Sequence, residues 1–528
     1  MEGLCLQALT LEQKLGQVIM ARGYRTPEEK EFLLEMVGKK AVGGIQIAFT
    51  DGWQDFVREV HAAADYPILL YNDMERGFPK GQRIPSAIAL GAVNDPEIAY
   101  EAARVTAIEA KAAGLNAVCG PVVDISCPGA LCKVPRTFGD DVETISALGR
   151  AMIRGYQDEG MLVMAKHYPG GSDMKDDPHI RDGVSMLTEE ELLKLDLIPY
   201  LDAIEKEDLT GIMTGHVMFP RIDPVYPATL SPKLISIIRK AGFKGLLITD
   251  SMAMMGICRR FGERETLGLA MAAGHDLVLP SYRLSFKESF EALKESFAQG
   301  VFTMEQLDTA VARVIEYQNR FRKPATAGEL TQAQKDRMDQ LNENILCARL
   351  REGQSLPLDR NKKYLFVVTA ENEYTQLTDD GKEIALPANR TKAQLLPVVR
   401  QLKETFPGCE TEIIQEFPNQ HQIQTVCDRA NHCDGVVFFT FAVCSSYYAD
   451  ESLTKRMEYL MGTLEGKLEA IVHVGNPYAV EPFQNVRRLL VGFATPYSEV
   501  SAIRALAGEY TPPYQLPVRF RPEKAVIQ

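Results

Sequence analysis

The feature of this sequence that most constrains its fold is a regular alternation of short apolar runs with amphipathic segments. Such runs are typical of strands buried on both faces of a parallel sheet, and the segments between them are typical of helices. The apolar runs are Val42 to Phe49, Pro67 to Tyr71, Leu115 to Val123, Leu162 to Ala165, Gly211 to Met218, Leu246 to Thr249 and Asp276 to Leu279. Seven repeats over about 320 residues predict an α/β fold that begins with a (β/α)8 TIM-type barrel rather than an open sheet.

A second domain is predicted where the pattern changes. Between Arg320 and Asp359 the chain becomes polar, and beyond it the alternation resumes with shorter repeats. The later apolar runs are Tyr364 to Val368, Thr411 to Ile414, Gly435 to Ala442, Ala470 to Val474 and Arg488 to Val491. We therefore predict a barrel over residues 1–325, a linker over 326–360 and a smaller α/β/α sandwich domain over 361–528.

The charge and the chain's N-terminus limit the classes of partner. The formal net charge is −13, from 71 acidic and 58 basic residues, so the overall field repels a polyanion and no nucleic acid partner is expected. The first residues lack the pattern of a signal peptide, and no stretch approaches 18 consecutive apolar residues, so no membrane partner is expected. The ten cysteines are scattered, as in proteins with reduced thiols, which predicts a cytoplasmic location. The oligomeric state cannot be predicted from the sequence.

Polar residues follow several of the apolar runs in the first domain. Asp73, Asp124, Lys166 with His167, His216 and Asp250 each lie at or just after the end of a run. In a barrel, the carboxyl ends of the strands carry the chemistry. We therefore expect these side chains to meet at one end of the barrel. The cysteine and histidine spacings match no metal-binding pattern, and no metal or organic cofactor is expected.

Two of these features can support acid–base or nucleophilic chemistry. In the loop from Ala165 to His179, Asp177 can accept a hydrogen bond from one nitrogen of His179 and leave the other nitrogen to exchange a proton. The alternative interpretation of this loop is a solvated polar segment. Asp250 follows a buried strand, so its carboxylate can act as a nucleophile or a ligand, or as the N-cap of the next helix.

The residues of this loop resemble glycoside hydrolase family three, and within it the β-N-acetylglucosaminidase branch. That branch carries the pattern K-H-F/Y-P-G-x-G-x-x-x-x-D-x-H. The matching positions here are Lys166, His167, Tyr168, Pro169, Gly170, Asp177 and His179. Further similarities run in family order along the first domain, in NDMERG at Asp73, PVVD ending at Asp124, the R-x-F of Arg136 and Phe138, MTGHV around His216 and TDSMAM around Asp250.

The resemblance implies a role for each matching residue. Asp250 would be the catalytic nucleophile, His179 the general acid/base and Asp177 the carboxylate that is paired with it. Asp73, Arg136, Lys166 and His167 would bind sugar hydroxyls, as would Arg83 and His216, which match less closely. The implied activity is that of a retaining, exo-acting β-N-acetylglucosaminidase that hydrolyses terminal β-linked N-acetylhexosamine through a covalent glycosyl-enzyme, with a small carbohydrate as substrate.

The sequence departs from the family pattern at three positions and leaves alternatives open. Gly171 and Ser172 replace the family's histidine and second glycine, and Pro178 stands inside the Asp177–His179 pair, where serine is usual. Because proline fixes its own φ and restricts Asp177 to extended conformations, we expect these departures to affect the shape of the loop and the choice of substrate more than the nucleophile. The alternatives are a β-glucosidase-type exo-glycosidase, a β-N-acetylglucosaminide phosphorylase and a non-catalytic sugar-binding protein. Because a complete set of candidate groups precedes residue 260, we expect Asp450 and Glu451 of the second domain not to be needed for catalysis.

Overall fold

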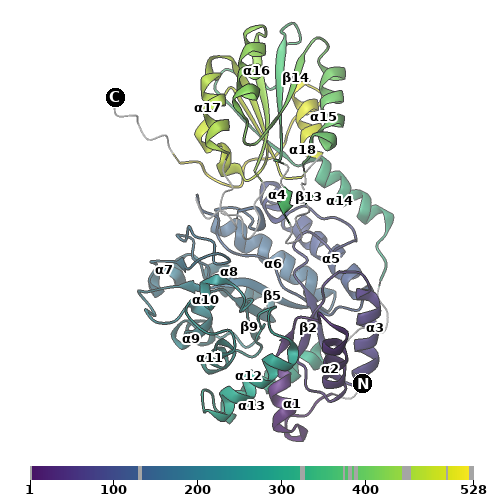
Figure 1. The fold of residues 1–528 in the computed structure, drawn as a ribbon, viewed down its shortest axis with the longest axis vertical. Coiled ribbons are helices and arrows are strands. Elements are labelled where there is room, and N and C mark those ends of the chain that lie inside the picture. The colour runs from purple at the N-terminus through teal and green to yellow at the C-terminus, as the bar shows by residue number, and fades with distance from the viewer. Residues whose placement is uncertain are drawn as a thin grey trace. The chain divides into compact units, whose positions relative to one another are not determined.

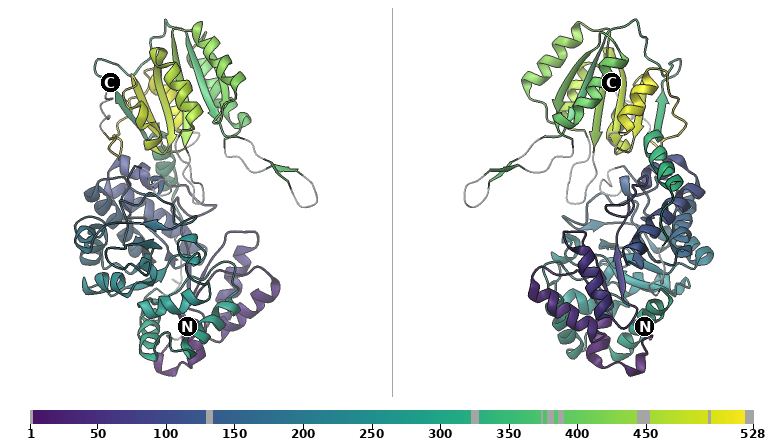
Figure 2. Two further views of the ribbon diagram at one scale, coloured as in Figure 1. Left: turned by 60° about the vertical axis from the view of Figure 1, so that its left-hand side comes forward. Right: turned by 90° about the vertical axis from the view of Figure 1, so that its right-hand side faces the viewer.

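The computed structural model describes residues 3–128, 134–321, 328–372, 375–377, 383–385, 390–442, 453–494 and 497–521. The chain divides into two compact units, Met1–Met338 and Asp339–Gln528, and this division lies inside the range predicted as the linker. Each unit is an α/β structure (Figures 1 and 2). No helix among the described residues is long and apolar enough to cross a membrane.

The first unit is built around a parallel sheet that closes on itself. Seven strands are neighbours in chain order, and the segment around Val278 completes the ring by bridging to Ile19 on one side, while Leu277 bridges to Ile248 on the other. The strands are β1 (Met20–Ala21), β2 (Gly44–Gln46), β3 (Leu69–Asn72), β4 (Ala117–Val118), β5 (Leu162–Tyr168), β7 (Gly211–Thr214) and β9 (Leu246–Thr249). This arrangement confirms the predicted barrel.

Helices surround this sheet, and apolar side chains fill it. The interior cluster includes Leu69, Tyr71, Met164, Met213 and Ile248, all of them almost completely buried. The helices of this unit are α1 (Leu11–Gln17), α2 (Pro27–Gly38), α3 (Trp53–Ala63), α4 (Ala87–Val93), α5 (Pro96–Ala112), α6 (Val142–Asp158), α7 (Glu189–Lys194), α8 (Ile198–Glu207), α9 (Pro232–Lys240), α10 (Met255–Cys258), α11 (Glu265–Ala273), α12 (Phe286–Ala298) and α13 (Met304–Arg320). A short parallel pair, β6 (Gly183–Val184) and β8 (Val217–Met218), lies in two of the loops.

Local sequence determines where these helices begin. Thr10 and Gln13 form the capping box of α1, and Asp95 caps α5, whose first residue is Pro96. Helix α1 ends at Gln17, although the apolar pattern of the sequence continues through Ile19. Residues 18–21 instead enter the barrel, because their backbone hydrogen bonds go to the Val278 segment and to β2.

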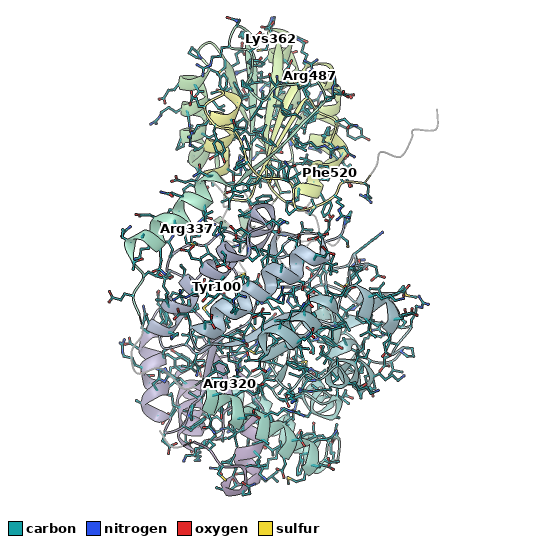
Figure 3. The ribbon with its side chains drawn as sticks, turned by 180° about the vertical axis from the view of Figure 1, so that it is seen from behind. Tyr100, Arg320, Arg337, Lys362, Arg487 and Phe520 are labelled. Carbon is teal, nitrogen blue, oxygen red and sulfur yellow. The ribbon has the colours of Figure 1, made fainter. Side chains whose placement is uncertain are left out.

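The second unit is a three-layer sandwich, as predicted. Its six-stranded sheet has the order β10-β17-β16-β15-β11-β14, and all neighbours are parallel except β10 and β17. The strands are β10 (Leu346–Leu350), β11 (Tyr364–Ala370), β14 (Glu410–Gln415), β15 (Gly435–Ala442), β16 (Leu468–Gly475) and β17 (Arg488–Gly492). Strand β10 and all of α14 (Gln332–Asn344) lie within the residues predicted to form the linker. Arg337 of α14, labelled in Figure 3, pairs with Glu101 of α5 inside the first unit.

Helices cover both faces of this sheet. Apolar residues of α15 (Lys392–Thr405) and α18 (Tyr497–Leu506) form a core with one face, and those of α16 (Gln420–Asn431) and α17 (Lys455–Thr463) with the other. A separate antiparallel ribbon joins β12 (Thr375–Leu377) to β13 (Glu383–Ala385). Asp450 and Glu451 lie outside the described residues, so the expectation about them stays a prediction.

A glycine in the first helix tests the tight packing beneath the barrel. A Cβ atom on Gly16 would lie 2.0 Å from the carbonyl oxygen of Ala41, which is backbone and cannot move aside cheaply. We expect Gly16→Ala to destabilise the first unit by about 1–3 kcal/mol, the usual cost of overpacking. In the control Gly38→Ala, the atom nearest to the added Cβ would be 3.8 Å away, so the free energy of unfolding should stay the same or rise slightly. Thermal unfolding checks both variants, and equal midpoints would contradict the packing argument.

Candidate active site

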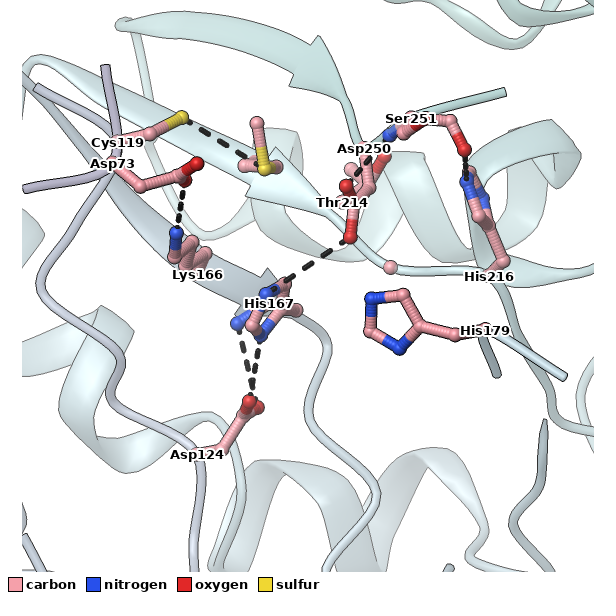
Figure 4. A network of polar contacts seen from close by, with 12 residues as sticks. Asp73, Cys119, Asp124, Lys166, His167, His179, Thr214, His216, Asp250 and Ser251 are labelled. Carbon is pink, nitrogen blue, oxygen red and sulfur yellow. Dashed lines mark hydrogen bonds and ion pairs between the residues drawn. The ribbon is translucent and has the colours of Figure 1, made fainter. Parts of the chain in front are cut away.

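The polar residues predicted to meet do lie at one end of the barrel. Asp73 follows β3, Asp124 follows β4, Lys166 and His167 belong to the carboxyl-terminal half of β5, and Asp250 follows β9. Because these strands are parallel, their carboxyl ends open on the same side, and the side chains converge there (Figure 4).

Asp250 lies partly buried at the end of β9. Its Oδ1 atom accepts the backbone N–H of Ser251 at 2.6 Å, and its Oδ2 atom lies 3.9 Å from Nε2 of His167. Burial on its own would raise the pKa of the Asp250 carboxyl, but the neighbouring His167 and His216 and the N–H of Ser251 lower it, so that the net pKa lies below the ordinary value. The carboxylate is therefore ionised at neutral pH. It does not cap a helix, since α10 begins at Met255 with Met254 as its N-cap.

A second carboxylate orients His167 next to Asp250. Oδ2 of Asp124 lies 2.8 Å from Nδ1 of His167, and the Asp124 side chain is completely buried. This contact directs Nε2 of the imidazole toward Asp250 (Figure 4). The guanidinium of Arg136 lies 3.5 Å from the same nitrogen. A buried carboxylate of this kind fixes both the tautomer and the direction of a histidine.

A buried cation, Lys166, links β5 to the segment that follows β3. Nζ of Lys166 contacts Oδ1 of Asp73 at 2.5 Å and Oε1 of Glu75 at 2.8 Å. Glu75 in turn receives two hydrogen bonds from Arg136, at 2.9 and 2.7 Å. Burial would raise the pKa of Glu75, but Arg136 and Lys166 hold it well below the ordinary value. Lys166 itself is almost completely buried, while the Asp73 side chain is half exposed and faces the opening.

Asp177 and His179 form the pair that the sequence predicts. Oδ1 of Asp177 lies 2.6 Å from Nδ1 of His179 and also accepts the backbone N–H of that residue at 2.9 Å. Asp177 is buried, so this segment is not a solvated polar loop. The His179 imidazole lies beside His216 and close to Asp250 (Figure 4). Since Nδ1 is held by the carboxylate, Nε2 is the nitrogen that can donate a proton to a ligand.

The loop that carries this pair is held at both of its ends. Near its start, the buried carboxylate of Asp196 accepts the N–H groups of Gly171 and Ser172, both at 2.8 Å, and the Ser172 hydroxyl at 2.9 Å. Near its end, the carbonyl groups of Pro178 and His179 accept N–H groups from Gly256 and Met255 of α10. The loop is therefore attached to the segment that follows Asp250.

The departures from the family pattern agree with this geometry. Gly171 has φ +114, a conformation that is strained for residues with a Cβ atom, so the histidine of the family pattern would not fit the same loop shape. Ser172 supplies the hydroxyl that binds Asp196. Gly171 and Ser172 therefore give the start of this loop a shape and a contact with Asp196 that depend on these two residues.

The remaining predicted residues are placed differently. His216 is buried with Nδ1 2.9 Å from the Thr229 hydroxyl and Nε2 2.8 Å from the carbonyl oxygen of Ser251, so it supports the Asp250–Ser251 turn. Burial lowers the pKa of His216, which favours its neutral form. Arg83 is exposed in the loop that follows β3. Its contact with a sugar stays a prediction, as does that of His216.

Sequence reasoning missed three contributors to this site. Glu75 lies two residues after Asp73 in NDMERG, and its position there was the only available signal. Asp124 was recognised as a residue at a strand end but not as the partner of His167, and Asp196 carried no signal at all. Among the residues that the structure describes, no group of three or more His, Cys, Asp or Glu side chains could hold a metal ion.

Comparison with known proteins identifies the family. Residues 10–317, more than half of the chain, match the family model described as "Glycosyl hydrolase family 3 N terminal domain". This chain therefore belongs to glycosyl hydrolase family 3, which confirms the family inferred from the loop motif.

Individual relatives carry more than one name. A "Beta-N-acetylglucosaminidase/beta-glucosidase" from Cellulomonas fimi is 28% identical over 324 residues, 58% of this chain and 56% of that relative, so the chain spans little more than half of its length. A "Beta-hexosaminidase" from Nitrosomonas eutropha is 31% identical over 258 residues, 45% of this chain and 73% of the relative.

Solved structures extend the similarity over both units. A glycoside hydrolase family 3 beta-N-acetylglucosaminidase from Paenibacillus sp. str. FPU-7 gives a TM-score of 0.80 at 25% identity, covering 97% of this chain and 99% of that chain. The beta-glucoside phosphorylase BglX gives 0.79 at 22% identity, covering 97% and 94%. At 22% identity, the similarity to this phosphorylase shows only a shared fold.

The contacts of Asp196 predict how the loop responds when they are removed. In Asp196→Ala, the N–H groups of Gly171 and Ser172 lose their acceptor, so residues 170–181 should exchange their amide hydrogens about ten-fold faster or more. The control Ser172→Ala keeps both N–H bonds and should change exchange much less. Hydrogen-exchange mass spectrometry measures both, with β5 as the internal reference. Equal protection of the loop in the two variants would contradict its anchoring by Asp196.

Proposed function

We propose that this chain is a retaining, exo-acting β-N-acetylglucosaminidase. The observation that carries the proposal is an ionised, partly buried Asp250 that faces the same opening as an imidazole paired with a carboxylate. A nucleophile and a proton donor at one site are the two groups that a double displacement requires. The family membership and the names of the relatives support this reaction class.

The reaction begins when the Asp250 carboxylate attacks the anomeric carbon. The bond from that carbon to the leaving oxygen breaks, and His179 gives its proton to this oxygen, so that an ester joins Asp250 to the sugar. His179, now neutral, then takes a proton from water as the water oxygen attacks the anomeric carbon. The ester bond breaks, Asp250 regains its charge, and the sugar leaves with its original configuration.

The remaining charged groups are suited to binding the sugar. Asp73 offers acceptor oxygens at the opening, while Lys166, Arg136 and His167 offer donors beside it. A pyranose presents hydroxyls that both donate and accept, so this mixture matches its chemistry. Asp124 and Glu75 hold these donors in place, since each binds one or two of them. The cytoplasmic location stays a prediction.

Replacing the nucleophile tests the assignment directly. Asp250→Asn keeps the shape of the side chain but removes the charge that attacks the anomeric carbon, so turnover of an aryl β-N-acetylglucosaminide should fall about 10³-fold or more. Asp158→Asn, at the end of the outer helix α6, is the matched control and should keep wild-type turnover. An Asp250→Asn enzyme that is folded and retains near wild-type kcat would exclude Asp250 as the nucleophile.

The role of Asp177 predicts a dependence on the leaving group. Without Asp177, the imidazole of His179 loses the partner that orients it, so proton donation should weaken by about 10²- to 10⁴-fold. In Asp177→Ala, kcat/KM should fall by this factor for alkyl or weakly acidic aryl leaving groups and much less for dinitrophenolate, which needs no proton. An equal loss for both kinds of substrate would show that the pair does not assist protonation.

The alternatives differ in products that can be measured. A β-glucosidase-type enzyme would cleave aryl β-glucosides faster than the N-acetylglucosaminides. A phosphorylase is chemically open, because a neutral imidazole repels an incoming phosphate less than a carboxylate base would; its main product would be a sugar 1-phosphate. A non-catalytic sugar-binding protein would show sugar binding by calorimetry and no turnover of any aryl glycoside.

A further inference from the structure

A small cavity at the carboxyl end of the barrel lies outside the groups considered so far. Its volume is about 90 Å³, and it lies between the residues that follow β1 and those that follow the Val278 segment. Its lining includes Arg22, Tyr24, Arg25, Pro280 and Tyr282. Tyr24 and Tyr282 are exposed, with 38% and 49% of their surface accessible, so the cavity has partly open aromatic walls.

One wall of this cavity is attached to the segment that follows Asp250. The N–H of Met252 donates to the carbonyl of Leu279 at 3.1 Å, and the Arg283 guanidinium donates to the carbonyl of Ala253 at 3.3 Å. Pro280 and Tyr282 lie between these two attachment points in the chain. The cavity therefore adjoins the turn that carries Asp250.

Arg22 lines the cavity and also affects Tyr71, a residue inside the barrel. Burial raises the pKa of the Tyr71 phenol, the charges of Asp73 and Asp250 raise it further, and the charge of Arg22 lowers it. The guanidinium of Arg22 and the carboxylates of Asp73 and Asp250 thus act on the same phenol from different strands. This agrees with the fold, in which Arg22 directly follows β1 and so lies at the same end of the barrel as Asp73 and Asp250, which follow β3 and β9.

The charges around the cavity are balanced except at Arg22. Arg25 is paired with Glu29 at 2.6 Å, and the neighbouring Arg283 is paired with Glu263. Arg22, which is partly buried, donates from Nε to the carbonyl oxygen of Pro280 at 2.9 Å, and among the described residues no carboxylate forms an ion pair with it. Guanidinium groups bind carboxylate and phosphate oxygens through paired, charge-assisted hydrogen bonds.

We propose that this cavity is an anion-binding subsite in which Arg22 receives a carboxylate or phosphate group of the leaving group or of the incoming acceptor. The inference rests on the proposed function, because it concerns what departs from, or attacks, the sugar held by Asp250. The volume accommodates a small charged group beside two aromatic rings. The anion has two possible sources, an acidic leaving group and inorganic phosphate.

With either anion, the atoms and charges of the reaction balance. An acidic leaving group departs with the proton from His179, as any other alcohol or phenol does, while its separate carboxylate stays bound to Arg22. With phosphate, an oxygen of the dianion attacks the anomeric carbon of the Asp250 ester. The ester bond breaks, Asp250 recovers its negative charge, and a singly charged sugar 1-phosphate leaves, so no electron or further co-reactant is needed.

The test compares Arg22→Gln and Arg22→Lys with the wild-type full chain on two matched substrates. These are the 4-carboxyphenyl and the 4-carbamoylphenyl β-N-acetylglucosaminides, which differ in charge but little in shape. For Arg22→Gln we expect kcat/KM to fall about ten-fold or more with the carboxyphenyl substrate and less than about three-fold with the neutral one. Arg22→Lys keeps the charge and should lie between. Arg58→Gln, an exposed arginine on α3, controls for the lost charge and should match wild type.

A second arm adds inorganic phosphate to reactions of the neutral substrate and measures sugar 1-phosphate. If phosphate is the anion, the wild type forms sugar 1-phosphate. The phosphate concentration that gives the half-maximal rate of its formation should then be at least about ten-fold higher for Arg22→Gln. A response confined to the carboxyphenyl substrate identifies an acidic leaving group instead. Equal effects of Arg22→Gln on both substrates with no change in the phosphate arm would overturn the subsite. A wild-type chain that cleaves neither substrate would refute the proposed function, whereas cleavage with neither a charge effect nor a phosphate response that depends on Arg22 would refute the subsite alone.

Discussion

Closure of the barrel is the constraint on which the rest of the first unit depends. The carbonyl of Val278 accepts the N–H of Met20, and the N–H of Val278 donates to the carbonyl of Val18, so the last segment of the ring is joined to the first. Without this join, β1 and the Val278 segment would be free edges of an open sheet. Closure brings the ends of β3, β5 and β9 around one opening, where Asp73, Lys166 and Asp250 can act on a single ligand.

Several carboxylates meet at the opening, and the cations beside them balance part of their charge. Lys166 is shared between Asp73 and Glu75, and Arg136 donates to both oxygens of Glu75. The pKa of Glu75 is thereby held down, although burial opposes this. Among the described residues no lysine or arginine forms an ion pair with Asp250, whose charge is supported by the N–H of Ser251 and by the neighbouring imidazoles. A carboxylate with fewer stabilising partners is a better nucleophile, because it loses less electrostatic stabilisation when it forms the bond to the sugar.

Much of this organisation follows from local sequence, and the exceptions have physical causes. Runs such as Leu246 to Thr249 were recognised as strands because they are buried on both faces. Strand β1 has only two residues and directly follows an amphipathic helix, so the helical pattern concealed it. Strand β10 is an edge strand with exposed residues at its end, and it was assigned to the linker. Asp177 and His179 could be paired from a spacing of two residues. Glu75 and Arg136 are 61 residues apart, and Asp196 is 24 residues from Ser172, so only the folded chain reveals these contacts.

In the proposed reaction, Asp250 and His179 act as nucleophile and proton donor on opposite sides of one glycosidic bond. The most direct test is the anomeric configuration of the first product, followed by proton NMR during rapid cleavage of an aryl β-N-acetylglucosaminide. Two displacements at the anomeric carbon predict that the β-anomer of the product forms first and the α-anomer appears later by mutarotation. Initial formation of the α-anomer would mean a single displacement and would contradict Asp250 as a nucleophile that forms a covalent intermediate.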